Sequence, residues 1–175
     1  MKSDSVVIVV IVVSIILLLT GGTAAVVMTF NEREKKYGTK IVKAFRAAGI
    51  DPAIGLAMAR LESGFDPKAK NETGTDLARG GAYGLFQMTR KTADALGIES
   101  DPATLMDPDF NINTTIALTK QNMARVGRNM EDIAAAHNSG KSLANAPSYT
   151  RQTYVPKVTQ YYLAYKARLE KGEFS

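Results

Sequence analysis

The spacing of hydrophobic and polar positions divides the chain into two regions. Residues 6–30, VVIVVIVVSIILLLTGGTAAVVMTF, contain no charged side chain over 25 positions. That length is sufficient for a helix to span a bilayer core of about 30 Å. From Asn31 onward, apolar residues instead recur at helical spacing among polar ones. The pattern predicts an N-terminal membrane anchor, residues 1–30, followed by one compact domain.

The apolar segment has a second interpretation, which is a cleaved signal peptide. Lys2 would form its positive region, and the small residues TGGTAA would form the cleavage site. The apolar run resumes at Val26 after these small residues, and this favours a retained anchor. Its orientation stays open: the basic residues that follow it favour a cytoplasmic domain, yet a long domain can be translocated despite such charges. Those residues are Arg33, Lys35, Lys36, Lys40 and Lys43.

Helix start and stop signals follow one another after the anchor. Asp51-Pro52 and Asp107-Pro108 each join an N-cap residue to a proline at the first helical position. The predicted helices cover residues 31–49, 51–64, 89–97, 107–127, 129–140 and 154–172. Residues 65–81 are polar and turn-rich and predict a long loop, and GAYGLFQM predicts a short hairpin or an irregular turn. We therefore expect a mainly α fold with at most a small β element, in which residues 31–49 form a linking helix and 50–175 the domain.

Composition excludes most catalytic schemes. The chain has no cysteine and only one histidine, His137, so a zinc site built on these residues lacks ligands, and neither metal nor cofactor is expected. No serine stands in a strand–turn–helix elbow, and no glycine-rich phosphate loop is present. The net charge of +5, from 22 basic and 17 acidic residues, suits contact with anionic envelope polymers. Without a long basic run it gives little support to nucleic-acid binding. The catalytic chemistry that these exclusions leave open is acid–base catalysis by a carboxyl group.

Glu62 is the candidate for that chemistry, because it stands in the last turn of the predicted helix 51–64, beside the buried stripe. That stripe consists of Ile54, Met58 and Leu61. Burial disfavours the charged form of a carboxyl group and lets it act as a general acid near neutral pH, as glycoside cleavage requires. The candidates for a second carboxylate are Asp66, Glu72 and Asp76, and none stands out. The alternative is that Glu62 is a solvated residue at a helix end.

Five segments resemble one enzyme family in their order and spacing. They are LESGFDPKA, GAYGLFQMTRKTADALGI, DPDFNINTTIAL, AAAHNSG and YVPKV, and the resemblance covers about residues 50–162. Together they resemble the lytic transglycosylase domain of the soluble lytic transglycosylase family, within the lysozyme-like superfamily. The resemblance implies an α+β lysozyme-like fold and an enzyme that cleaves peptidoglycan strands.

The resemblance also implies a mechanism that needs one carboxyl group and no cofactor. Glu62 occupies the position of the family's catalytic glutamate. It would protonate the glycosidic oxygen between N-acetylmuramic acid and N-acetylglucosamine. It would then accept the proton of the muramic acid 6-hydroxyl, which attacks the anomeric carbon and leaves a 1,6-anhydro product.

Further residues are implied to bind substrate, and each also has an ordinary role in packing or helix capping. They are Ser63, Gln87, Met88, His137, Asn138 and Tyr154. Gln87 would line the sugar groove, and the Tyr154 hydroxyl would orient the Glu62 carboxyl group. The chain departs from the family pattern at His137, where a tyrosine usually precedes the asparagine. It also lacks an acidic residue shortly before Tyr154, where some members carry a second glutamate.

Three functions are consistent with these features. The first is a membrane-anchored lytic transglycosylase acting on peptidoglycan strands. The second is a hydrolytic muramidase of goose-lysozyme type, and the third is a non-enzymatic glycan-binding or assembly module. We expect a single-pass membrane protein, held by residues 6–30, whose domain faces the peptidoglycan of a bacterial envelope. A component of a phage virion is the alternative location, and assembly partners are expected in either one.

Overall fold

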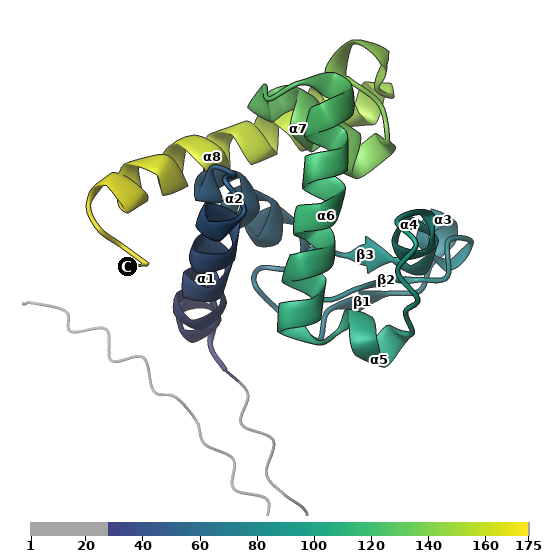
Figure 1. Ribbon diagram of the computed structural model, residues 1–175, viewed down its shortest axis with the longest axis horizontal. Coiled ribbons are helices and arrows are strands. Elements are labelled where there is room, and N and C mark those ends of the chain that lie inside the picture. The colour runs from purple at the N-terminus through teal and green to yellow at the C-terminus, as the bar shows by residue number, and fades with distance from the viewer. Residues whose placement is uncertain (1–27, 175) are drawn as a thin grey trace, which may run out of the picture.

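The computed structural model describes residues 28–174, in which helices pack around and beside a small sheet (Figure 1). The helices are α1 (Phe30–Ala47), α2 (Pro52–Glu62), α3 (Gly74–Leu77), α4 (Arg90–Ala95), α5 (Pro102–Leu105), α6 (Pro108–Val126), α7 (Met130–Ser139) and α8 (Val155–Glu170). The strands are β1 (Lys70–Asn71), β2 (Ala82–Tyr83) and β3 (Met88–Thr89). A 3₁₀ turn, Leu143–Asn145, and a π-helical turn, Thr150–Tyr154, connect α7 to α8. The mainly α prediction is confirmed.

The predicted helix starts agree with local capping. Asp51 accepts a hydrogen bond from the backbone N–H of Ala53 at 2.9 Å, and Asp107 accepts one from Phe110 at 2.8 Å. Thr89 caps α4 in the same way, through the N–H of Thr92. Such caps satisfy backbone donors that have no partner within the helix, and each one here joins residues only two or three positions apart. This locality explains why pattern reading located these starts.

The region predicted as a long loop, residues 65–81, differs from the prediction, since it contains β1 and α3. The segment GAYGLFQM is a hairpin, in which β2 and β3 pair antiparallel with Ala82 opposite Thr89. The short helix α5 and the π-helical turn were not predicted. Each of these elements has only two to five residues, too few for hydrophobic periodicity to show.

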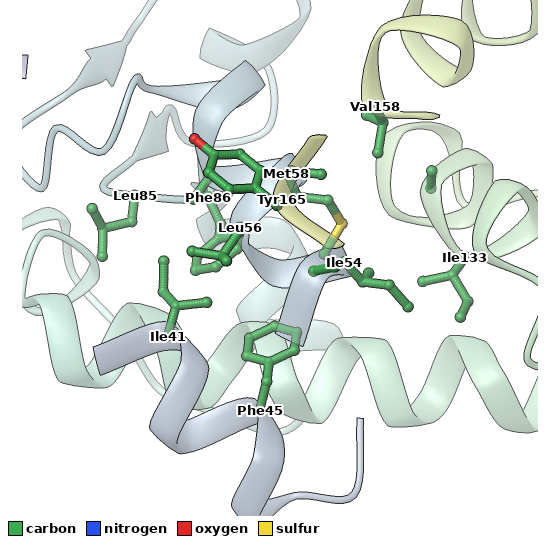
Figure 2. Close-up of a cluster of buried hydrophobic side chains, with 14 of the residues drawn as sticks. Ile41, Phe45, Ile54, Leu56, Met58, Leu85, Phe86, Ile133, Val158 and Tyr165 are labelled. Carbon is green, nitrogen blue, oxygen red and sulfur yellow. The ribbon is translucent and has the colours of Figure 1, made fainter. Parts of the chain in front are cut away.

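The main hydrophobic core lies between α1, α2, α7 and α8 (Figure 2). Ile41 and Phe45 of α1 are fully buried there, against Leu56 and Met58 of α2. Leu85 and Phe86 reach the same core from the hairpin, as do Ile133 of α7 and Val158 and Tyr165 of α8. The predicted linking helix, residues 31–49, corresponds to α1, and its buried side chains belong to the same core as those of α2, α7 and α8.

The predicted anchor falls almost wholly outside the described residues, because it covers residues 6–30 and the structure describes the chain from residue 28. Within residues 28–174, no helix combines the length and apolar character needed to cross a bilayer. The first described helix, α1, begins at Phe30, behind a capping box between Thr29 and Glu32.

A second, smaller apolar cluster joins β2 and β3 to α4 and α5. Its buried members are Tyr83, Met88, Ala93 and Leu105. Helix α6 runs between this cluster and the main core (Figure 1). Ile112 of α6 belongs to the main core, whereas Phe110 and Leu118 pack on the second cluster. Helix α6 therefore packs on both apolar clusters and connects them.

Asn111 fixes the hairpin loop onto α6. Its side chain is fully buried, donates to the carbonyls of Tyr83 and Leu105 at 3.0 and 2.8 Å, and accepts from the N–H of Phe86 at 3.0 Å. The loop passes close by at Gly84, where an added Cβ would lie 2.5 Å from the Leu105 carbonyl oxygen. Three hydrogen bonds from one buried amide thus set the path of the segment that leads to Gln87.

Replacing Asn111 with alanine is expected to lower the free energy of unfolding by about 2–3 kcal/mol, because buried backbone groups lose their partners. Asn113→Ala is the matched control, since Asn113 is exposed on the same helix, and it is expected to change stability by less than about 0.5 kcal/mol. Urea unfolding monitored by circular dichroism measures both values. Equal stabilities of the two variants would contradict this role for Asn111.

Candidate active site

Glu62 is the last residue of α2, and the backbone reverses directly after it. Gly64 and Phe65 both have positive φ, at 60° and 62°, and the Phe65 ring is completely buried. The Ser63 hydroxyl donates to the Leu85 carbonyl at 2.8 Å and accepts from the N–H of Asp66 at 3.1 Å. These contacts fasten the end of α2 to the hairpin loop and fix the Glu62 backbone.

A cavity of about 130 Å³ opens beside the Glu62 side chain. It lies where the end of α2 meets the β2–β3 hairpin, α3 and α7. Its lining includes Glu62, Asp76, Arg79, Ala82, Phe86, Gln87, Met88, Thr89, Thr92, Leu118, His137 and Asn138. The structure thus brings together four predicted site residues, Gln87, Met88, His137 and Asn138, around the predicted acid.

The Glu62 carboxyl group is held by Tyr154, whose hydroxyl donates to Oε1 at 2.5 Å. Three effects together raise the pKa of Glu62 to about 7: burial raises it most, the Tyr154 hydrogen bond lowers it, and the nearby Asp76 raises it. The Glu62 side chain nevertheless keeps 18% of its surface exposed, so a molecule in the cavity can reach it. At neutral pH the protonated and ionised forms of Glu62 are both populated.

His137 lies next to Glu62 without neutralising it. Its Nε2 is 3.7 Å from Glu62 Oε1, a distance that would count as an ion pair if the imidazole were charged. Burial, however, lowers the pKa of His137 to about 4, despite a backbone hydrogen bond with Phe86. The imidazole is therefore neutral at neutral pH. A neutral neighbour leaves the pKa of Glu62 high, whereas an imidazolium would lower it.

The structure separates the three candidates for a second carboxylate. Asp66 pairs with Arg33 at 2.9 Å, and Glu72 accepts a hydrogen bond from the Tyr83 hydroxyl at 2.8 Å. Neither lines the cavity. Asp76 does line it, and its Oδ2 accepts from the Asn71 amide at 2.7 Å. Asp76 is thus the second acidic group of the site, which the sequence did not distinguish from the other two.

Gln87 and Asn138 present polar groups at the cavity. The Gln87 amide nitrogen donates to the carbonyls of Ala69 and Gly84 at 3.2 and 3.1 Å, and the backbone at Gln87 has a positive φ of 47°. Its amide oxygen has no partner among residues 28–174, so it is available as an acceptor. The Asn138 oxygen accepts from the Thr150 hydroxyl at 2.7 Å, and its amide nitrogen is available as a donor.

The remaining predicted site residues have different placements. Met88 is buried and lines the cavity as an apolar wall. Tyr154 donates a hydrogen bond to the Glu62 carboxyl group but is not part of the cavity lining. The hydroxyl of Ser63 is engaged with Leu85, and Ser63 is absent from the cavity lining. Ser63 is also the C-cap residue of α2, and these contacts agree with helix capping, the alternative to substrate binding at this position.

Sequence reasoning named Asp76 only as one of three candidate carboxylates, and it missed Arg79, Thr92 and Leu118 as lining residues. Asp76 and Arg79 come from the polar segment 65–81, whose length already pointed to a functional loop. Thr92 and Leu118 carry no local signal, because only the packing of α4 and α6 against the hairpin brings them to the cavity.

Comparison with known proteins identifies relatives of this arrangement. Residues 39–156 match the family model described as the transglycosylase SLT domain. Among solved structures, an inactive mutant of the lytic transglycosylase Slt from Pseudomonas aeruginosa, in which glutamine replaces a glutamate, is 25% identical over 74% of this chain, with a TM-score of 0.59. That match covers 24% of the Pseudomonas chain.

Two further structures share the fold at 23% identity, each over 80% of this chain. One is the 70-kDa soluble lytic transglycosylase in complex with bulgecin A, with a TM-score of 0.63, and the other is the 70-kDa soluble lytic transglycosylase from Escherichia coli, with a TM-score of 0.60. Both matches cover 26% of those longer chains. The chain therefore spans about a quarter of the length of the structures that it resembles.

The contacts of Glu62 predict opposite pKa changes in two variants. Tyr154→Phe removes a hydrogen bond that favours the carboxylate, so the pKa of Glu62 is expected to rise by about one pH unit. Asp76→Asn removes a like charge, so the pKa is expected to fall. Carbon-13 NMR titration of the glutamate carboxyl carbons measures both. Tyr149→Phe, at an exposed tyrosine, is the control; shifts in the same direction for Tyr154→Phe and Asp76→Asn would contradict the assignment.

Proposed function

Because the chain belongs to the transglycosylase SLT domain family, we propose that it is a peptidoglycan lytic transglycosylase with Glu62 as its acid and base. The observation that carries this proposal is the environment of Glu62. Its carboxyl group has a pKa raised to about 7, accepts a hydrogen bond from Tyr154, and borders a polar cavity. A group with such a pKa can both give and accept a proton near neutral pH, as a reaction with one acid–base residue requires.

In the proposed reaction, protonated Glu62 gives its proton to the oxygen that links N-acetylmuramic acid to N-acetylglucosamine. The bond between that oxygen and the anomeric carbon breaks, and the N-acetylglucosamine end leaves as an alcohol. The Glu62 carboxylate then takes the proton from the muramic acid 6-hydroxyl as its oxygen bonds to the same carbon. The product is a 1,6-anhydro sugar, Glu62 regains its proton, and no water is consumed.

The polar groups of the cavity suit an N-acetylated sugar. Such a sugar offers an amide N–H as donor and carbonyl and hydroxyl oxygens as acceptors. The free amide oxygen of Gln87 is an acceptor for the former, and the Asn138 amide nitrogen is a donor for the latter. Met88 and Phe86 add apolar surface for the sugar ring. We propose that these four residues bind the strand, with Tyr154 and Ser63 holding Glu62 in place.

One observation favours a second candidate, hydrolysis of the same bond by a muramidase. Asp76 lies in the Glu62 cavity, and a second carboxylate is what water activation uses in inverting and related glycosidases. In that reaction Asp76 would accept a proton from water, and the product would carry a free reducing end. The non-enzymatic alternative gains no such support, because glycan binding alone does not call for a carboxyl group with a pKa near 7.

We also propose that the domain faces the peptidoglycan, held to the membrane by residues 6–30. This rests on the substrate proposed above and on the uncharged run of that segment. Protease added to intact spheroplasts is expected to digest the domain without permeabilisation. Digestion only after the inner membrane is opened would place the domain in the cytoplasm, and this would leave delivery within a virion as the remaining route to the substrate.

The central prediction concerns the reaction product. The chain, purified in detergent, is expected to release 1,6-anhydro-muropeptides from isolated peptidoglycan, identified by mass spectrometry. Glu62→Gln is expected to lower the rate by at least about 10²–10⁴-fold, because it removes the acid and base. The parent's rate is expected to fall as pH rises through about 7, since the protonated form that starts the reaction is lost.

Glu99→Gln is the matched control, because Glu99 is an exposed glutamate outside the cavity, and it is expected to keep the parent rate. Full activity of Glu62→Gln would exclude Glu62 as the catalytic group. Products with reducing ends, lost in Asp76→Asn, would select the muramidase. Retention of anhydro products by Asp76→Asn agrees with the transglycosylase.

A further inference from the structure

Two segments that lie outside the family match pack against each other. They are residues 28–38, which contain the start of α1, and residues 157–174, which contain most of α8. The Tyr165 hydroxyl of α8 donates to Glu34 of α1, and the Arg168 guanidinium donates to both carboxylate oxygens of Glu34, at 2.8 and 3.1 Å. Paired hydrogen bonds between charged groups are strong and fix geometry. We refer to the two segments as the flanking segments.

Phe30, which begins α1, extends this contact to the turn that follows Glu62. Its ring lies 6.1 Å from the ring of Phe65, and the Arg60 guanidinium lies over it, 3.8 Å from its centre. Arg60 stands two residues before Glu62 and Phe65 three residues after it. Phe30 therefore contacts the chain on both sides of the candidate acid.

Phe65 has a backbone conformation that needs such support. Its φ of 62° lies in the left-handed region, which is rare for a residue with a large side chain. A conformation of this kind persists where the surrounding structure fixes it. The Phe65 ring is completely buried, and its centre lies 6.1 Å from those of both Phe30 and Tyr165. One aromatic ring from each flanking segment thus packs on Phe65 and holds the turn.

Arg33 provides a second contact with the same turn. Its guanidinium pairs with the Asp66 carboxylate at 2.9 Å. The backbone N–H of Asp66 donates to the Ser63 hydroxyl, which itself donates to the Leu85 carbonyl. Since Ser63 directly follows Glu62, the first flanking segment is linked to the backbone of the acid through Asp66 and Ser63.

We propose that Phe30 and Arg33 are positioning residues for Glu62, because they hold the turn of residues 63–66 that fixes its carboxyl group at the cavity. This inference rests on the proposed function, since it assigns both residues a part in the reaction of Glu62. Neither residue lines the Glu62 cavity, and neither lies within the family match, residues 39–156. Displacement of a catalytic group by about 1 Å can lower a rate about 100-fold. Under this proposal, full activity requires side chains outside the family match.

Kinetics of the full chain in detergent test the proposal. Phe30→Ala and Arg33→Gln are each expected to lower kcat on isolated peptidoglycan by about tenfold or more, with KM changed by less than about twofold, because the cavity lining is untouched. The Arg33 and Asp66 side chains are 27% and 36% exposed, so loss of their ion pair is expected to leave the chain folded. A parent-like kcat in either variant would overturn the positioning role of that residue.

Conservative variants and a control separate positioning from general damage. Phe30→Tyr keeps the aromatic ring and Arg33→Lys keeps the charge, so each is expected to restore most of the parent kcat. Lys43→Gln removes an exposed cation further along α1 and is expected to keep the parent kcat. Losses as large in the conservative variants or in Lys43→Gln as in Phe30→Ala and Arg33→Gln would overturn the proposal.

An NMR measurement distinguishes this proposal from the proposed function, because it needs no turnover. Loss of the Phe30 ring is expected to release the turn and admit water to Glu62, whose carboxyl group faces Tyr154, His137 and Asp76. Carbon-13 titration of Phe30→Ala is therefore expected to move the pKa of Glu62 from about 7 toward 4.5, and Phe30→Tyr is expected to keep the parent value.

The two readouts can fail separately. A Glu62 pKa that is unchanged in Phe30→Ala would overturn the positioning role of Phe30 even if the parent releases anhydro products. A lowered pKa in Phe30→Ala, together with a parent that releases no anhydro products, would support the positioning role and contradict the proposed function.

Discussion

The structure of the site depends on keeping one carboxyl group away from water while leaving it within reach of a ligand. Folding moves the pKa of Glu62 from 4.5 to about 7. Between these values the folded chain binds more protons than the unfolded one, so stability falls as pH rises through this window. By linkage this difference costs up to about 3 kcal/mol above pH 7. Contacts elsewhere must offset it, because total stabilities are only about 5–15 kcal/mol.

Those contacts converge on the end of α2 from three directions. Tyr154, 92 residues further along the chain, reaches Glu62 from the π-helical turn before α8. The Ser63 hydroxyl donates to the Leu85 carbonyl of the hairpin loop, and the Asn111 side chain of α6 accepts from the N–H of Phe86 in the same loop. Each of these side chains satisfies backbone or carboxyl groups that would otherwise be buried without partners. The polar network therefore stabilises the fold and holds the acid in place at once.

The parts of this arrangement that sequence reasoning predicted are the local ones. Asp51, Thr89 and Asp107 mark helix starts because a capping side chain bonds to backbone only two or three residues away. Glu62 was found because it ends an apolar helix and matches a family motif. Asp76 could not be told apart from Asp66 and Glu72 in the sequence, since only the packing of α3 brings it to the Glu62 cavity. Helix capping was one of the two roles considered for Ser63, but its hydrogen-bond partner Leu85 was not predicted, because it lies 22 residues away.

His137 lies between the Glu62 cavity and an adjoining cavity of about 510 Å³, whose lining includes Arg79, Lys91 and Arg125 but no acidic residue. It lines both of them, and it stands beside Glu62 on one side and within the cationic lining of Arg79, Lys91 and Arg125 on the other. A charged imidazole there would lower the pKa of Glu62 and add a fourth cation to a cavity without acids. Burial prevents both effects by lowering the pKa of His137 to about 4. A neutral imidazole therefore lets an acid with a raised pKa and a cationic pocket lie side by side without either cancelling the other.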